Sequence, residues 1–273
     1  MSKTDGQAKP RKRKESSVAR TLRRAWTRAR LALPGRTIAM RGGYPRLLRR
    51  PGDYNFDSSL GLRLEKRFVS TTLRHIEEPF VFLDIGANIG IYSLYADRLP
   101  RCIAVLAFEP VWDNFHFLTG NLRANRTTKV RPFCVAIGPS GVVGLRFIPH
   151  HSGMSHVTDP ASANVVAPSG GADFIDAALQ PFAGQRLVAK IDVEGAEIAV
   201  LDELARTSAF SQVSDLIVEF KAHEQNPGGF LDDLAARIAS LGFEAVTRRS
   251  KDTHFRRARP LAPAVGASGG AAP

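Results

Sequence analysis

A run from Val81 to Gly90, with the sequence Val-Phe-Leu-Asp-Ile-Gly-Ala-Asn-Ile-Gly, constrains the fold of this chain more than any other segment. It predicts a buried strand, a tight glycine turn and the start of a helix. Gly86 and Gly90 lack a Cβ, so the turn can bend sharply and bring backbone N–H groups close to a ligand. The Gly-x-Asn-x-Gly spacing differs from the Gly-x-Gly-x-x-Gly of dinucleotide binders. It therefore favours a cationic, nucleoside-type ligand over a pyrophosphate.

Downstream of this run, apolar strands alternate with amphipathic helices. We predict core strands at 80–84, 102–108, 129–137, 186–191 and 215–220, and helices at 59–76, 89–98, 112–125, 194–205 and 230–241. An extra strand is predicted within 141–150, a loop of small residues at 150–171, and a final strand pair at 243–248 and 254–257. Continuous apolar strands between helices are typical of a parallel sheet covered on both faces, which is an α/β fold.

Positive charge gathers at the start of the chain. Residues 1–50 hold 16 Lys and Arg against 2 acidic residues, whereas the rest hold 22 basic and 24 acidic residues. We therefore divide the chain into a basic, partly disordered arm and lead-in (1–52), one α/β domain (53–257) and a flexible tail rich in Ala, Pro and Gly (258–273). The domain itself is not expected to bind nucleic acid specifically. A short basic helix at 18–33 is either a solvated tail or a weak contact with an anionic surface.

Composition also bears on the compartment. Cys102 and Cys134 fall in or near predicted strands without metal-ligand spacing, which indicates small core residues in a reducing environment. No apolar run approaches the roughly 20 residues of a membrane span. The N-terminus has charge but no apolar core of a signal peptide. These observations predict a cytoplasmic protein.

Acidic residues end the first two predicted core strands. Asp84 closes the first strand, and Glu109 closes the second one 25 residues later. Ligands of doubly wound sheets lie beyond the carboxyl ends of the strands, where an acidic residue can accept hydrogen bonds from a ribose. Each residue alone also has a structural explanation, because Asp84 could cap the next helix and Glu109 could start one. Together with the glycine turn, they predict a ribose-bearing ligand.

Three short sequence motifs, taken together, are specific enough to indicate a resemblance to a known family. They are Asp84-Ile-Gly-Ala-Asn-Ile-Gly90, Ala107-Phe-Glu-Pro110 and Lys190-Ile-Asp-Val-Glu-Gly-Ala-Glu197. In this order they resemble the FkbM-type family of S-adenosylmethionine-dependent methyltransferases, over roughly residues 80–220. The resemblance implies a class I, Rossmann-like fold with helices on both faces of a seven-stranded, mostly parallel sheet whose last strand is antiparallel. Family members typically methylate an oxygen of a sugar or natural product.

The resemblance also implies roles for individual residues around S-adenosylmethionine. Gly86, Asn88 and Gly90 would line its methionine and ribose parts, and Asp84 would lie beneath that turn. Glu109 would hold the ribose hydroxyls. Ile137 would border the adenine, although residues 133–138 contain no Asp to accept the adenine amine.

Candidate catalytic residues lie later in the chain. Asp192 ends a core strand on the same rim, where it could position an acceptor hydroxyl, take its proton or bind the cofactor's amino group. His156, in the predicted loop, is a second candidate base, and a solvated bystander is the alternative. Glu219 and His223 are further rim candidates.

Two more carboxylates accompany Asp192. Glu194 and Glu197 are predicted in the first turn of the next helix, where carboxylates stabilise free N–H groups. With Asp192 and Glu219 they could hold a divalent metal, but no tight ligand spacing demands one, so no metal is predicted.

The sequence thus predicts a methyltransferase that methylates a hydroxyl of a small-molecule or glycan acceptor. The alternative is a catalytically silent Rossmann-like binding module that acts through its basic arm. A nicotinamide-dependent oxidoreductase also uses an acid at a strand end, but the Gly-x-Asn-x-Gly spacing disfavours it.

Overall fold

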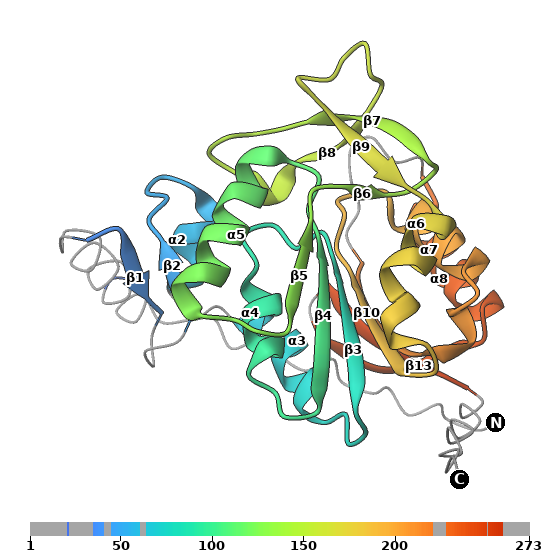
Figure 1. Cartoon of the computed structure of the whole chain (residues 1–273). Helices are drawn as coiled ribbons and strands as arrows, with labels where there is room; N and C mark the ends of the chain where they lie inside the picture. Colours follow the sequence, from blue (N-terminus) through green and yellow to red (C-terminus); the bar gives the residue numbers. More distant parts are fainter. Residues whose placement is uncertain are drawn as a thin grey trace, which may run out of the picture.

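A seven-stranded sheet forms the centre of the chain (Figure 1). The computed structural model describes residues 21, 35–40, 45–60, 64–220, 228–249 and 251–258. The strand order is β12-β13-β11-β10-β3-β4-β5. The strands are β3 (Phe80–Ile85), β4 (Cys102–Phe108), β5 (Val130–Phe133), β10 (Arg186–Ile191), β11 (Val213–Glu219), β12 (Phe243–Arg249) and β13 (Asp252–Arg257). Strand β13 runs antiparallel to both of its neighbours, β11 and β12, whereas the pairs from β11 to β5 are parallel. The predicted fold class, with an antiparallel last strand, is confirmed.

Helices cover both faces of this sheet (Figure 1). One face packs against α3 (Leu64–Arg74), α4 (Ile91–Asp97) and α5 (Trp112–Asn125), and the other against α6 (Ala172–Leu179), α7 (Glu197–Arg206) and α8 (Phe230–Ser240). Every residue of β3 is buried. Its side chains alternate between two clusters, with Val81, Leu83 and Ile85 in one and Phe80 and Phe82 in the other. A strand apolar on both faces is what a sheet between two helical layers requires.

The order of the strands reverses at β3. The chain runs outward from β3 through β4 to β5, then returns to place β10 on the opposite side of β3. Asp84 therefore lies in register with Ala107 of β4 and Lys190 of β10. This is the switch point at which doubly wound folds bind ligands.

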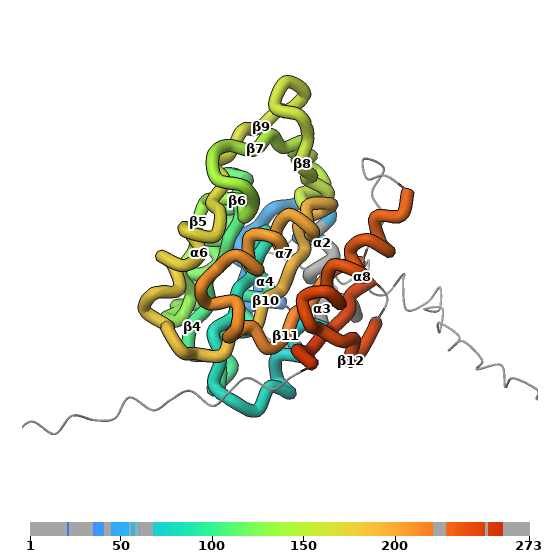
Figure 2. Tube along the Cα trace, turned by 90° about the vertical axis from the view of Figure 1, so that its right-hand side faces the viewer, coloured from blue at the N-terminus to red at the C-terminus, as the bar shows by residue number. Residues whose placement is uncertain are grey.

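A second, four-stranded sheet stands beyond the end of the large one, at the top of both Figure 1 and Figure 2. It has the order β6-β9-β7-β8, with β6 (Ala136–Ile137), β7 (Gly141–Arg146), β8 (His156–Thr158) and β9 (Val165–Gly170). The predicted strand at 129–137 therefore divides between two sheets, and the predicted loop at 150–171 contains two strands. A short 3-10 helix, η1 (Ser152–Met154), precedes β8. These strands are short and pair mainly with β7, so they leave little periodicity in the sequence.

Two helical predictions also need correction, and one helix was missed. The predicted helix at 59–76 is replaced by α2 (Tyr54–Leu60) and α3, and α6 was not predicted at all. The helix predicted from residue 194 begins at Glu197, because Glu194 adopts a left-handed φ of 52° in the preceding turn. Glu194 is therefore not in the first helical turn. The predicted helix at 18–33, apart from Thr21, and His223 lie outside the described residues.

Part of the lead-in is fixed on helix α5. Strands β1 (Thr37–Ala39) and β2 (Arg46–Leu48) form an antiparallel pair. Asn121 Oδ1 accepts the backbone N–H of Leu48 at 2.6 Å, and Asn125 Oδ1 accepts that of Arg46 at 2.8 Å. Leu47 is fully buried in the cluster that includes Leu118 and Leu122 of α5. These contacts make the β1–β2 pair part of the helical layer.

Both cysteines are free thiols. Cys102 is buried, and burial raises its pKa to about 12. Such a thiol is unreactive at neutral pH. Among the described helices, none combines the length and apolar character that crossing a bilayer demands.

Candidate functional site

A cavity of about 480 Å³ opens at the carboxyl ends of β3, β4, β10 and β11. The turn after β3 and the segment 135–137 form part of its wall, and residues 151–155 of the loop before β8 form another part. Glu109, Asp192, Glu194 and Glu219 supply acidic groups to the lining. The volume falls within the range of small-molecule and cofactor sites. The switch point of the sheet therefore carries a concave site.

Two glycines are required by close packing in the turn after β3. Gly86 has a φ of 77°, and a Cβ there would lie 2.0 Å from the carbonyl oxygen of Asp192. Gly90 has a φ of 83°, and a Cβ there would lie 2.3 Å from Leu118 Cδ1. Both the left-handed backbone and the lack of space exclude other residues. The first contact joins the turn directly to the end of β10.

The backbone N–H groups of this turn are already used within the protein. Those of Gly86 and Ala87 donate to the Phe108 carbonyl, and that of Asn88 donates to Glu109 Oε2 at 2.8 Å. The Ile89 N–H donates to Asn88 Oδ1, and the Gly90 N–H to the Ala87 carbonyl. The turn therefore folds back onto the end of β4 while it lines the cavity, and the predicted approach of its N–H groups to a ligand stays a prediction.

Glu109 accepts hydrogen bonds from three residues in and beside the turn. Its Oε1 accepts the Val111 N–H at 3.0 Å and Asn114 Nδ2 at 3.2 Å, while Oε2 accepts the Asn88 N–H. Its side chain lines the cavity, yet the residue is only 4% exposed. Burial raises its pKa to about 7, against the lowering effect of these hydrogen bonds and of Lys190. Its position fits the predicted contact with a ribose, which stays a prediction.

Lys190 connects the two sides of the switch point. Its Nζ donates to the Gly86 carbonyl at 3.1 Å and lies 3.5 Å from Asp84 Oδ1 and 3.3 Å from Asp192 Oδ2. Burial lowers the pKa of Lys190, but Asp192 and Asp84 outweigh it and raise the pKa above its usual value. Asp84 lies fully buried beneath the turn, as expected, and also accepts Ser93 Oγ at 2.6 Å. Lys190 was not predicted as a site residue, although a lysine within an otherwise apolar strand was the signal for it.

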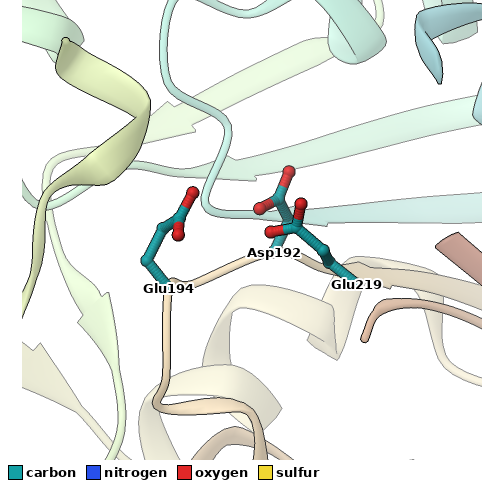
Figure 3. A group of neighbouring side chains, drawn as sticks. All are labelled: Asp192, Glu194 and Glu219. Atoms are coloured by element: carbon teal, nitrogen blue, oxygen red, sulfur yellow. The ribbon is translucent and has the colours of Figure 1, made fainter. Parts of the chain in front are cut away.

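Three carboxylates meet on the β10 and β11 side of the cavity (Figure 3). Asp192 and Glu194 follow β10, Glu219 ends β11, and one ligand oxygen from each lies within 4.8 Å of the others. Lys251 forms an ion pair with Glu219. The fourth acidic residue of this region, Glu197, lies below the rim and accepts the Gly195 N–H at 3.1 Å. Burial, and then the charges of Asp192 and Glu194, raise its pKa to about 7 despite the hydrogen bonds that Glu197 accepts.

The remaining predicted site residues divide into two groups. Ile137 lines the cavity and is 6% exposed, which fits the predicted adenine border. His156 is not part of the lining, and its Nδ1 lies 3.1 Å from the carbonyl oxygen of Met154 in its own loop. His151 lines the cavity instead and stacks on Tyr54 with a centroid distance of 4.3 Å. His151 was not predicted as a site residue. The sequence does not show which histidine of the loop faces the cavity, because the folded conformation of the loop decides it.

Comparisons with known proteins agree with the resemblance that the motif blocks indicated. No protein-family model matches the chain. Methyltransferase sdnD of Sordaria araneosa is 26% identical over an aligned length of 204, and the match covers 63% of this chain and 76% of the relative.

Among solved structures, methyltransferase FkbM of Methylobacillus flagellatus matches 74% of this chain and 52% of its own at 18% identity, with a TM-score of 0.48. This chain thus spans about half the length of that protein. The structure of TYW2 of M. jannaschii in complex with AdoMet matches 82% of this chain and 89% of its own at 12% identity, with a TM-score of 0.41.

Proposed function

We propose that this chain is an S-adenosylmethionine-dependent methyltransferase that methylates a hydroxyl oxygen of a sugar or natural product. The observation that carries this proposal is Glu109, a buried carboxylate held at the cavity wall by the Asn88 N–H of the glycine turn. A carboxylate at this strand end can accept hydrogen bonds from ribose hydroxyls. The named curated relative, also a methyltransferase, supports the same activity.

The lining of the cavity fits a nucleoside that carries positive charge. Ile85, Phe108, Val135 and Ile137 provide apolar wall, and the lining carries more carboxylates than lysines. S-adenosylmethionine, when bound, supplies a methyl group already activated by its sulfonium. The protein then mainly needs to align the acceptor oxygen with that methyl group and to exclude water.

Asp192 is the residue that we assign to the acceptor's proton. Its carboxylate lines the cavity and lies 3.3 Å from Lys190 Nζ. An ionised carboxylate can accept the hydroxyl proton during or after methyl transfer. Lys190 itself remains behind, held by Asp84 and the Gly86 carbonyl, and so it fixes the position of Asp192.

Calorimetric titration of the full chain with S-adenosylmethionine and with S-adenosylhomocysteine tests the proposal. We expect saturable binding that Glu109→Ala abolishes and Glu109→Gln weakens at least about tenfold, because hydrogen bonds to a charged group contribute about 1.5–3 kcal/mol. Glu244→Gln, an exposed glutamate of β12, is the matched control and should bind like wild type. Absence of binding by wild type, or equal binding by folded Glu109→Gln, would overturn the proposal. Titration with NADH should give no binding.

A further inference from the structure

Carboxylates outnumber lysines among the described residues that line the cavity. Its lining holds five carboxylates and two lysines, which are Glu109, Asp192, Glu194, Glu219 and Asp252 on one side and Lys190 and Lys251 on the other. Lys190 is already shared between Asp84 and Asp192. Carboxylates crowded in a partly buried space repel each other unless a cation lies among them. The cavity is therefore built for positively charged occupants.

The crowding is tightest where Asp192, Glu194 and Glu219 meet. Glu194 is 9% exposed and Glu219 only 2% exposed, so two of the three carboxylates are shielded from water. Figure 3 shows the three carboxylates reaching into one common space from the loop after β10 and from the end of β11. Their nearest oxygens, all within 4.8 Å of one another, surround a space of ionic size. Oxygen ligands of a bound cation at about 2.0–2.6 Å lie up to roughly 5 Å apart.

Glu219 supplies a second, independent observation. Neither of its buried carboxylate oxygens accepts a hydrogen bond from the residues that the structure describes. Lys251 forms an ion pair with this carboxylate, from a side chain that is itself 38% exposed. Glu219 is therefore a buried carboxylate whose oxygens lack hydrogen bonds from the described residues. Burying a carboxylate without hydrogen bonds is costly, so a further ligand for Glu219 is expected.

We propose that Asp192, Glu194 and Glu219 bind a hard divalent cation of the Mg²⁺ and Mn²⁺ class. An all-oxygen, all-carboxylate set suits these ions and disfavours softer metals that prefer sulfur or imidazole ligands. Lys251 is the counter-ion of Glu219 when the cation is absent, and its exposed side chain can turn towards solvent when the cation binds. The sequence alone did not demand this site, because Glu219 lies 27 residues beyond Asp192.

The cation also has a function within the cavity. A divalent ion at this rim would bind the acceptor's hydroxyl oxygen and make its proton easier to remove. Asp192 would then hold the ion and still take the acceptor's proton. This role rests on the proposed methyl transfer, whereas the cation site itself does not.

Binding of Mn²⁺ to the full chain, followed by the loss of the free-ion electron paramagnetic resonance signal, tests the site. We expect one saturable site at neutral pH that Glu219→Gln and Glu194→Gln each weaken at least tenfold. Lys251→Met should bind Mn²⁺ several-fold more tightly than wild type, because it removes the competing cation. Glu244→Gln, matched in chemistry but outside the cavity, should behave like wild type.

Two results would overturn the cation site. One is the absence of saturable Mn²⁺ binding below about 1 mM. The other is equal binding by wild type and by both folded Gln variants of the rim. Parallel titration with S-adenosylhomocysteine separates this outcome from failure of the proposed function. Cofactor binding without Mn²⁺ binding contradicts only the cation site, and Mn²⁺ binding without cofactor binding contradicts only the methyltransferase assignment.

Discussion

Buried charge is stabilised differently in the two halves of the rim, which is the edge of the large sheet at the carboxyl ends of its parallel strands. On the β3 and β4 half, each oxygen of Glu109 accepts at least one hydrogen bond, and the turn uses all N–H groups from Gly86 to Gly90. On the β10 and β11 half, Glu219 has no hydrogen bond from the described residues, and three carboxylates share one space. In the first half Glu109 and the turn satisfy one another's hydrogen bonds, whereas in the second half the buried carboxylate of Glu219 accepts none from the described residues.

This difference assigns separate tasks to the two halves. A rim whose polar groups hold one another is preorganised, so it can receive a ligand without rearranging. A rim with unbalanced charge stores free energy that a ligand or cation releases on binding. Lys190 joins the halves, since its Nζ contacts Gly86 on one side and Asp192 on the other.

We expect the largest loss of stability from adding a side chain where the turn after β3 packs against the segment after β10. Gly86→Ala would place a methyl group 2.0 Å from the Asp192 carbonyl oxygen, in a left-handed backbone. Strain and overlap together should cost at least about 4 kcal/mol in the free energy of unfolding, measured with urea. Gly184→Ala is the matched control, because Gly184 has a similar φ of 78° with nothing within 4 Å, and it should cost about 1 kcal/mol. Similar losses of stability in the two variants would mean that the turn does not pack closely against the end of β10.

Removal of the shared lysine comes next. Lys190→Met should lower the free energy of unfolding by about 3 kcal/mol, because it leaves Asp84 buried with an uncompensated charge. Lys129→Met is the control, since Lys129 Nζ is half-buried and donates to the Leu99 carbonyl away from the rim. It should cost about 1 kcal/mol. Equal losses measured with urea would show that Lys190 does not bridge the halves.

A smaller effect is expected from pH. The pKa values of Glu109 and Glu197 are each raised to about 7, so the folded chain binds more protons than the unfolded chain between pH 4.5 and pH 7. Stability contributed by these groups therefore falls as pH rises through this window. Glu197→Gln removes a charge that lies near Asp192 and Glu194, and it should stabilise the protein by about 1–2 kcal/mol at pH 8 and by nothing at pH 4. A stabilisation that is independent of pH, in thermal unfolding scans, would contradict the assignment.

The smallest effect separates the two histidines of the loop over the cavity. His151→Ala removes the stack on Tyr54 and should cost about 1 kcal/mol in the free energy of unfolding. His156→Ala should change it by less than about 0.5 kcal/mol, because that side chain contacts mainly its own loop. Affinity for S-adenosylhomocysteine should fall only in the first variant. Larger losses of stability and affinity in His156→Ala than in His151→Ala would indicate that His156, and not His151, faces the cavity.

Much of the large sheet could be predicted from the sequence because its signals are local. Strand β4 is a continuous apolar run, β3 and β10 are largely apolar, and helix α5 follows Glu109 at the expected place. The position of Asp84 beneath the turn was implied by the family resemblance of the motif blocks. Local pattern suffices where each element is buried on a face that its own periodicity defines.

The small sheet and the rim could not be predicted in this way. β8 and β9 owe their existence to pairing with β7, which lies 10 or more residues away, and Glu219 joins Asp192 only through the parallel pairing of β10 with β11. The left-handed turn at Glu194 lies where its acidic neighbours suggested a helix start. Long-range pairing decides these features, and no single stretch of sequence records it.

The saturated turn after β3 has a consequence for competition inside a cell. ATP and the nicotinamide dinucleotides share the adenosine portion of S-adenosylmethionine and need donors for their phosphates. From Gly86 to Gly90 they would meet no backbone N–H available to them, and across the cavity they would meet the carboxylates of Asp192, Glu194 and Glu219. We therefore expect phosphate-bearing adenosine compounds to bind the cavity more weakly than S-adenosylmethionine, because the turn offers their phosphates no backbone donor.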